Sequence, residues 1–175
     1  MYSNLPDSLP ELCRLIKSQF IHPFSADIPK GRSNEDLKYQ NIKEILMGLK
    51  TYNDEGLIIN RQPNERLILS CRSYSILLAS ILKYCNIPVR VRYGFASYIH
   101  PNFHVAHAIC QVWNVKESRW MLVDPGLPMI DFSEDMFDFG SEAWIKYQQK
   151  KLNPENYGIP PEYRGAEMIL ATLCF

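Results

Sequence analysis

The spacing of apolar residues predicts helices in the first third of the chain. In DSLPELCRLIKSQF the apolar side chains recur at helical spacing, and Ser8 and Glu11 fit a capping box at the start. A second helix is predicted from Ser33 to Leu49, with Ser33 as its N-cap and one buried apolar stripe. Turn residues in TYNDEG close that segment. We therefore expect a helical N-terminal region over about residues 1–60.

The segment LILSCRSYSILLASILKYCNIPVRVRYG is the most hydrophobic part of the chain. From Cys71 to Tyr84, apolar residues cover nearly all faces of a helix, which is typical of a helix buried at the centre of a domain. Asn86 and Pro88 are expected to end this helix. The pattern therefore places a cysteine at the first residue of the central helix.

After this helix the apolar pattern changes to strict alternation. Apolar residues from Val89 to Phe95 alternate with arginine and glycine, which predicts a strand with one wetter face. A loop, SYIHPNFH, is expected next, and VAHAICQVW and SRWMLVD predict two further strands joined by the short hairpin connection NVKE. The order of elements predicts an α+β fold, in which an antiparallel sheet packs on the central buried helix.

The C-terminal part, about residues 133–175, returns to a helical pattern. Ser141 is the expected cap of the helix GSEAWIKYQQKKL, and Asn153 with Pro154 is expected to stop it. A last helix is predicted from about Glu162 to the end, where ILATLCF would pack against the body. Because no repeat or linker divides the 175 residues, we expect a single domain.

The composition narrows the class of protein. The chain has 19 basic and 19 acidic residues, so its formal net charge is zero, which argues against a nucleic-acid partner. Its longest apolar run is far too short to cross a bilayer, and its N-terminus carries prolines and acids where a signal peptide needs apolar residues. We therefore expect no membrane partner and a cytoplasmic protein, with signal-less export left open. The five cysteines are interpreted as free thiols in a reducing compartment.

Cys71 is the candidate nucleophile because it lies at the front end of the central helix. A thiol reacts as its thiolate, and the free N–H groups and dipole of a helix N-terminus stabilise that anion. A cysteine nucleophile also needs a base and a group that orients the base. His107, on the second predicted strand, and Asp124, at the end of the third, are the candidates for these roles.

The connection NVKE sets the expected register of these two strands. With a four-residue loop, Trp113 faces Ser118, and continuing along both strands brings His107 directly opposite Asp124 on the same face. Directly opposed Cβ atoms lie about 4.5–5.5 Å apart, which is within reach of a contact between a carboxylate and an imidazole. The sequence therefore predicts a catalytic triad of Cys71, His107 and Asp124.

This triad predicts acyl transfer through a thioester intermediate. Asp124 would fix the tautomer of His107, and His107 would take the proton from Cys71, whose thiolate attacks a carbonyl. Water or an amine then resolves the acyl-enzyme, and the sequence leaves both open. The N–H of Cys71 is a natural oxyanion donor, whereas a second donor is not assigned. The expected partners are peptide, protein or small amide and ester substrates, without cofactor or metal, and the oligomeric state stays open.

Three motifs in this order resemble the core of the transglutaminase-like cysteine proteins: SCRSYSILLASILKYCNIPVRVRYGF, HAICQVW and RWMLVDPGL. That superfamily places a cysteine at the start of a buried helix, with histidine and aspartate on adjacent antiparallel strands. The resemblance implies a papain-like fold with its core over about residues 61–128, and it implies that Cys71 is the nucleophile, His107 the base and Asp124 the orienting acid. RQPNERL and NPENYGI are similar to segments of small bacterial transglutaminase-like proteins.

Other interpretations stay open at the level of sequence. His104 is a rival base, although it lies three residues from His107 and would face the other side of the strand. A zinc site made of Cys71, His104 and His107 would lack a fourth ligand at the spacing such sites use. Ser73 and the two alanines beside His107 depart from the family pattern, which leaves open the alternative of a catalytically silent domain that binds a peptide or protein. A purely structural domain is the third possibility.

Overall fold

The structure is a computed structural model that describes residue 2, residues 5–58 and residues 60–174. Its centre is a mostly antiparallel sheet in which five strands follow the order β6-β5-β4-β3-β7, while β8 pairs with β4 and β9 pairs with β8. These strands are β3 Val89–His100, β4 Phe103–Asn114, β5 Arg119–Asp124, β6 Met129–Ile130, β7 Phe137–Phe139, β8 Tyr157–Ile159 and β9 Tyr163–Arg164. A separate parallel pair joins β1, Phe20–Ile21, to β2, Leu67–Ile68.

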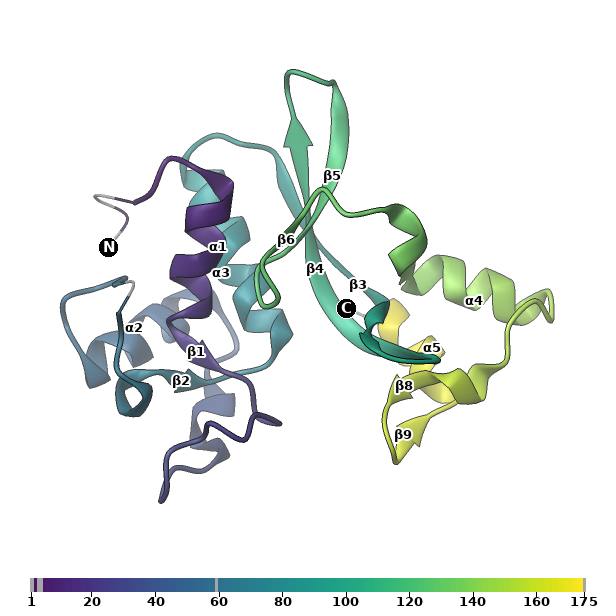
Figure 1. Ribbon diagram of the computed structural model, residues 1–175, viewed down its shortest axis with the longest axis horizontal. Coiled ribbons are helices and arrows are strands. Elements are labelled where there is room, and N and C mark those ends of the chain that lie inside the picture. The colour runs from purple at the N-terminus through teal and green to yellow at the C-terminus, as the bar shows by residue number, and fades with distance from the viewer. Residues whose placement is uncertain (1, 3–4, 59, 175) are drawn as a thin grey trace.

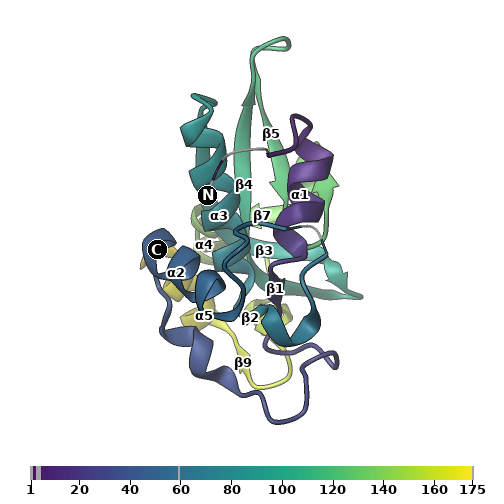
Figure 2. The same ribbon diagram turned by 90° about the vertical axis from the view of Figure 1, so that its left-hand side faces the viewer.

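Helices lie on both sides of the long β3–β4 hairpin. The described helices are α1 Leu9–Lys17, α2 Ile42–Tyr52, α3 Cys71–Tyr84, α4 Gly140–Gln148 and α5 Ala166–Ala171. Figure 1 shows α1, α2 and α3 gathered on one side of the hairpin and α4 and α5 on the other. In Figure 2, the first three helices and the β1–β2 pair face the viewer in front of the sheet. The predicted α+β arrangement, an antiparallel sheet packed on a buried helix with flanking helices, is confirmed.

The main hydrophobic core lies between helices α1–α3 and the sheet. Its fully buried members include residues of each helix and of the sheet: Ile16, Ile45, Leu49, Leu77, Leu78, Ile81 and Cys110. Because apolar residues cover most faces of α3, this helix is enclosed on nearly every side, as its sequence predicts. A smaller cluster covers the opposite face of the sheet and contains Ala96, Ile109, Leu122, Phe137 and Phe139.

The bounds of α3 are those that the sequence predicts. The helix begins at Cys71, follows Ser70 in extended conformation, and ends at Tyr84. Asn86 adopts a positive φ of 58°, and the N–H of Ile87 donates to the carbonyl of Leu82 at 2.8 Å, which is the pattern of a left-handed helix cap. The predicted first helix is also confirmed, because Ser8 caps α1 by accepting from the N–H of Glu11.

The single helix predicted from Ser33 to Leu49 is wrong. A short 3-10 helix occupies Asn34–Lys38, and α2 starts only at Ile42. The reason is a capping box that the prediction missed: the Asn41 side chain accepts from the N–H of Glu44 at 3.1 Å, and the Glu44 carboxylate reaches back to the N–H of Asn41. This reciprocal pair starts a new helix eight residues after Ser33.

The predicted loop SYIHPNFH is mostly strand. β3 continues to His100 and β4 begins at Phe103, so that only Pro101 and Asn102 turn the chain. Asn102 has a φ of 60°, a left-handed conformation that asparagine tolerates better than most residues. The consequence is that Tyr98 and His104, expected in a loop, lie on paired strands.

The predicted helix bounds near the C-terminus also need correction. Helix α4 starts at Gly140, one residue before the expected cap Ser141, and it ends at Gln148, before the predicted KKL, where Lys150 takes a φ of 56°. The last helix begins at Ala166 instead of about Glu162, because β9 pairs with β8 first. The predicted helix end at Phe175 lies outside the described residues.

The register of β4 and β5 differs from the prediction by two residues. Trp113 pairs with Trp120, not with Ser118, and the last pair is Cys110 with Val123. The connecting loop does have four residues, but it is Val115–Ser118 instead of NVKE. A shift of the loop by one residue changes the pairing by two, so every side chain keeps its face. One further pair would set Asp124 opposite Ile109, so His107 and Asp124 share a face as diagonal neighbours and not as a direct pair.

Candidate active site

Cys71 is held at the start of α3 by contacts between this helix and β4. The hydroxyl of Ser75, one turn further along α3, donates to the carbonyl of Ala108 at 3.0 Å. The thiol of Cys110 in turn donates to the carbonyl of Ser75 at 3.3 Å. These buried bonds fix the first turn of the helix against β4 and thereby fix the position of Cys71.

The thiol of Cys71 lies where the outer edge of β4 has no neighbouring strand. β5 pairs with β4 only as far as Cys110, and β8 pairs only with His104 and Val105, so the described strands leave residues 106–109 uncovered on this edge. The backbone N–H of Ala108 donates to the Cys71 sulfur. A backbone N–H lies in the plane of its sheet, so the thiol takes the place of the missing strand partner.

His107 connects the thiol to a buried carboxylate. Its Nε2 lies 2.8 Å from Oδ2 of Asp124, and its ring is also hydrogen-bonded to Cys71. Because Nε2 is used by Asp124, Nδ1 is the nitrogen left for the sulfur. Diagonal neighbours in a sheet have Cβ atoms about 7–8 Å apart, and the lengths of the two side chains close that distance. The three residues that the sequence singled out are therefore brought together in the order Cys71, His107, Asp124.

Asp124 is almost completely buried, yet its two oxygens have several donors. Tyr98 donates its hydroxyl to Oδ2 at 2.8 Å, and the backbone N–H groups of Gly126 and Leu127 donate to Oδ1 at 2.8 and 3.1 Å. Burial alone would raise the pKa of Asp124, but the contact and charge of His107 and these further donors together lower it. Asp124 therefore remains a carboxylate next to the imidazole.

The surroundings of Cys71 and His107 favour a thiolate–imidazolium pair. Burial alone would raise the pKa of Cys71, but hydrogen bonds from His107 and His22, the charge of His107 and the N–H of Ala108 lower it to about 6. Burial alone would lower the pKa of His107, but its contacts with Asp124 and Cys71 raise it. The two groups titrate as one unit, in which each charge stabilises the other.

The other described thiols lack such surroundings. Cys13 and Cys110 are fully buried, and burial raises the pKa of both, that of Cys13 to about 12. Cys85 is exposed at the opposite end of α3. Cys71 is only partly buried, so among these four thiols it combines a lowered pKa with access from solvent.

Sequence reasoning missed two side chains of this site, Tyr98 and His22. Tyr98 belongs to the predicted loop, whereas in the structure it lies on β3, which extends to His100. His22 directly follows β1, and its ring is hydrogen-bonded to the sulfur of Cys71.

His104, the rival base, belongs to a different cluster. Its Nδ1 lies 3.1 Å from Oδ2 of Asp138, and its ring stacks on Tyr157 at a centroid distance of 4.3 Å. Within the described residues, no three histidine, cysteine or acidic side chains are grouped as a metal site would require, and this includes Cys71, His104 and His107. His104 therefore belongs to the Asp138–Tyr157 cluster, whereas His107 is the β4 histidine that contacts the thiol.

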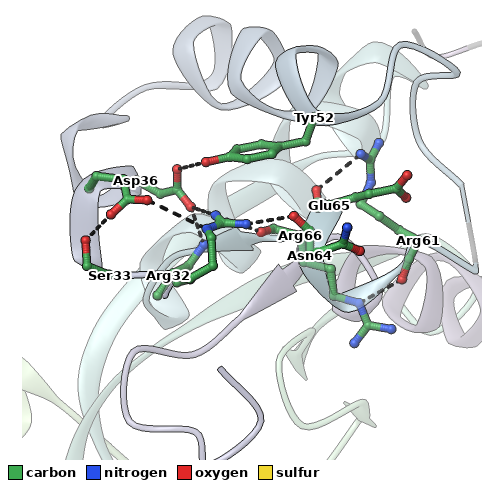
Figure 3. A network of polar contacts seen from close by, with 10 residues as sticks. Arg32, Ser33, Asp36, Tyr52, Arg61, Asn64, Glu65 and Arg66 are labelled. Atoms are coloured by element: carbon green, nitrogen blue, oxygen red, sulfur yellow. Dashed lines mark hydrogen bonds and ion pairs between the residues drawn. The ribbon is translucent and has the colours of Figure 1, made fainter. Parts of the chain in front are cut away.

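A second polar network anchors the segment that leads into α3 (Figure 3). Arg61, 1% exposed, donates to the side chain of Gln19 at 3.0 Å and to the carbonyl of Leu49 at 3.2 Å. Asp36 accepts from the N–H of Ile68 at 2.9 Å and from the Arg32 guanidinium at 2.6 Å. The buried charges of Arg61 and Asp36 thus have hydrogen-bond partners, and they hold β2 in place just before Cys71.

The fold and this arrangement define a class of protein: an α+β protein with cysteine, histidine and aspartate joined by hydrogen bonds at the start of a buried helix. The family model of the transglutaminase-like superfamily matches residues 60–125. That segment contains Cys71, His107 and Asp124, so the part of the chain that is similar to this superfamily is the part that holds these three residues. Neither the curated proteins nor the solved structures gave a match. In the part of the chain that the structure describes, every helix is too short or too polar to cross a membrane.

Proposed function

We propose that this protein is a cysteine-dependent acyl-transfer enzyme that acts on an amide or ester bond. Cys71 is the nucleophile, His107 the proton carrier and Asp124 the residue that orients His107. The observation that carries the proposal is the contact of a partly accessible thiol with His107, whose Nε2 lies 2.8 Å from the buried carboxylate of Asp124; the lowered pKa of the thiol agrees with this arrangement. The match to the transglutaminase-like superfamily supports the same chemistry.

In the proposed reaction the Cys71 thiolate attacks the carbonyl carbon of the substrate. A bond forms between Sγ and carbon, and the electron pair of the C=O double bond moves onto the oxygen. His107 then gives its proton to the leaving nitrogen or oxygen as that bond breaks, and a thioester remains. Water or an amine attacks the thioester while His107 accepts its proton, and the second intermediate expels Cys71 as a thiolate.

Asp124 acts in this scheme through His107 and not on the substrate. Its Oδ2 contact with Nε2 turns Nδ1 toward the thiol, and its negative charge stabilises the imidazolium that exists before each proton donation. The bonds from Tyr98 and from the turn after β5 hold the carboxylate in this orientation. The proposed substrates are peptides, proteins or small amides and esters.

Burst kinetics with p-nitrophenyl acetate test this proposal. The wild-type protein should release about one equivalent of nitrophenol per protein in a fast phase, because deacylation of the thioester is slower than its formation. Cys71→Ala should abolish the fast phase. Cys85→Ala is the matched control, because Cys85 lies exposed at the other end of the same helix, and it should leave the burst unchanged.

A burst that survives in Cys71→Ala would overturn the assignment of the nucleophile. If the wild type shows no burst with a panel of acyl electrophiles and Cys71→Ala still binds a peptide ligand as the wild type does, the protein is a silent binding domain instead of an enzyme.

A further inference from the structure

A second imidazole, that of His22, contacts the reactive sulfur from the N-terminal part of the chain. β1 and β2 pair in parallel, with Phe20 beside Leu67 and Ile21 beside Ile68. The N–H of Leu69 continues this ladder by donating to the carbonyl of Ile21 at 3.0 Å. The pairing carries the next residue of each strand to the start of α3, and the His22 ring is hydrogen-bonded to the sulfur of Cys71 there.

The backbone around His22 determines which of its nitrogens carries the proton. The N–H of Phe24 donates to Nδ1 of His22 at 3.3 Å. A ring nitrogen that accepts a hydrogen bond carries no proton, so the nitrogen of this ring that can donate is Nε2. Nε2 is then the nitrogen that donates to the sulfur.

His22 and His107 therefore differ in chemistry although both touch the same sulfur. Asp124 stabilises the charged form of His107. Among the described residues no ion pair joins His22 to a carboxylate, and the backbone N–H of Phe24 contacts its Nδ1. His107 is paired with a carboxylate that assists proton transfer, whereas His22 contacts the sulfur only as a hydrogen-bond donor.

We propose that Nε2–H of His22 is the second donor of the oxyanion hole, together with the backbone N–H of Cys71. This inference rests on the proposed acyl-transfer function. When the thiolate attacks a carbonyl, its negative charge moves from sulfur to the carbonyl oxygen, which is bonded to the carbon that the sulfur has joined. A donor already directed at the sulfur needs only a small movement to reach that oxygen, and fixed donors of this kind stabilise the transition state most strongly.

The test compares two reagents that need the same thiolate but differ in the oxyanion. p-Nitrophenyl acetate acylates Cys71 through a tetrahedral oxyanion, whereas iodoacetamide alkylates it by direct displacement without one. The ratio of the two rates, both taken on their high-pH plateau, is measured in wild type and in His22→Phe, which keeps an aromatic ring but has no donor. Because both rates come from the same folded population, a partly unfolded variant changes both rates and leaves their ratio intact.

We expect His22→Phe to lower this ratio about 100- to 1,000-fold, the loss that removal of one oxyanion donor causes in other enzymes. His22→Gln offers an amide N–H at a similar position, so its ratio should be at least about tenfold higher than that of His22→Phe. The matched control is His100→Phe, because His100 is an exposed histidine at the β3–β4 turn, and it should leave the ratio unchanged.

An unchanged ratio in His22→Phe overturns the inference. If both rates also fall by the same factor, His22 only tunes or positions the thiol. Failure of the proposed function gives a different result: iodoacetamide would then alkylate Cys71 of the wild-type protein, whereas p-nitrophenyl acetate would not acylate it.

Discussion

The pKa of Cys71, lowered to about 6, predicts that its alkylation rate hardly depends on pH between about 6 and 9. A thiol with that pKa is about half thiolate at pH 6 and fully thiolate at pH 9, so its rate rises about twofold. An ordinary thiol with a pKa near 8.5 goes from about 0.3% to about 75% thiolate, so its rate rises about 250-fold. The difference between a twofold and a 250-fold rise does not depend on how accessible the thiol is, because accessibility changes the rates at pH 6 and pH 9 by the same factor.

Iodoacetamide followed by tryptic digestion measures this profile at a single residue. Trypsin releases LILSCR, which holds Cys71 alone, and the separate peptide YCNIPVR, which holds Cys85 as a reference in the same sample. His107→Ala removes both the hydrogen bond and the charge that oppose burial at Cys71. The pKa of the thiol should then return to at least its ordinary range, and labelling at pH 6 should fall by about 100-fold or more while labelling at pH 9 changes little.

Two results would refute this reasoning. One is a wild-type profile at Cys71 that rises by about 100-fold or more from pH 6 to pH 9, since the thiol would then have an ordinary pKa. The other is a His107→Ala profile as flat as that of the wild type, which would mean that His107 does not stabilise the thiolate.

Three further predictions concern the support of the site and the core. Asp124→Asn removes the charge that raises the pKa of His107, so alkylation of Cys71 at pH 6 should fall at least about tenfold, and an unchanged rate contradicts the role of Asp124. Tyr98→Phe removes the 2.8 Å hydrogen bond to Asp124 and should lower the free energy of unfolding in urea by about 1.5–3 kcal/mol at neutral pH. This bond lowers the pKa of Asp124, so it stabilises the folded protein fully above the ordinary carboxyl pKa and loses its effect as the pH falls through the lowered pKa. If the destabilisation by Tyr98→Phe does not change with pH, this explanation is wrong. Leu78→Ala should cost about 2–5 kcal/mol in the same measurement, because Leu78 is fully buried, and Ile76→Ala, at a half-buried position of the same helix, should cost clearly less.

The sequence was sufficient to predict α3 and the position of the thiol. Apolar residues on nearly every face of residues 71–84 indicate a central helix, and Asn86 supplies the left-handed cap that ends it. These signals lie within the helix and its cap, so they can be read without knowledge of the rest of the chain. The cap Ser8 of α1 is equally local, whereas the cap at Asn41 is harder to predict because Ser33, eight residues earlier, is also a typical N-cap residue.

The register of β4 and β5 was predicted on the correct face but two residues from its true position. Asn114 looked like the first loop residue, yet it pairs with Arg119, and its side chain accepts from the backbone N–H of Lys116 at 3.1 Å. Trp113 and Trp120 then meet across the strands at a centroid distance of 5.4 Å. This aromatic pair was the available signal, since cross-strand aromatic contacts stabilise one register over another.

The approach of His22 to Cys71 could not be predicted from local pattern. It depends on the parallel pairing of two-residue strands that lie 47 residues apart, Phe20 with Leu67 and Ile21 with Ile68. Neither strand is long enough to show alternation, and the pairing is held by Arg61 and Asp36 from two other segments. A long-range arrangement of this kind becomes visible only in the folded chain.

The measurement that tests the central claim most directly is the site of acetylation after brief exposure to p-nitrophenyl acetate and acid quenching. Mass spectrometry of the tryptic peptides locates the acetyl group. The account predicts one acetyl group as a thioester on Cys71 in LILSCR, formed at pH 6 in the wild type and strongly reduced in His107→Ala. Acetylation of Cys71 no faster than that of Cys85 in YCNIPVR, or equally fast in His107→Ala, would contradict it.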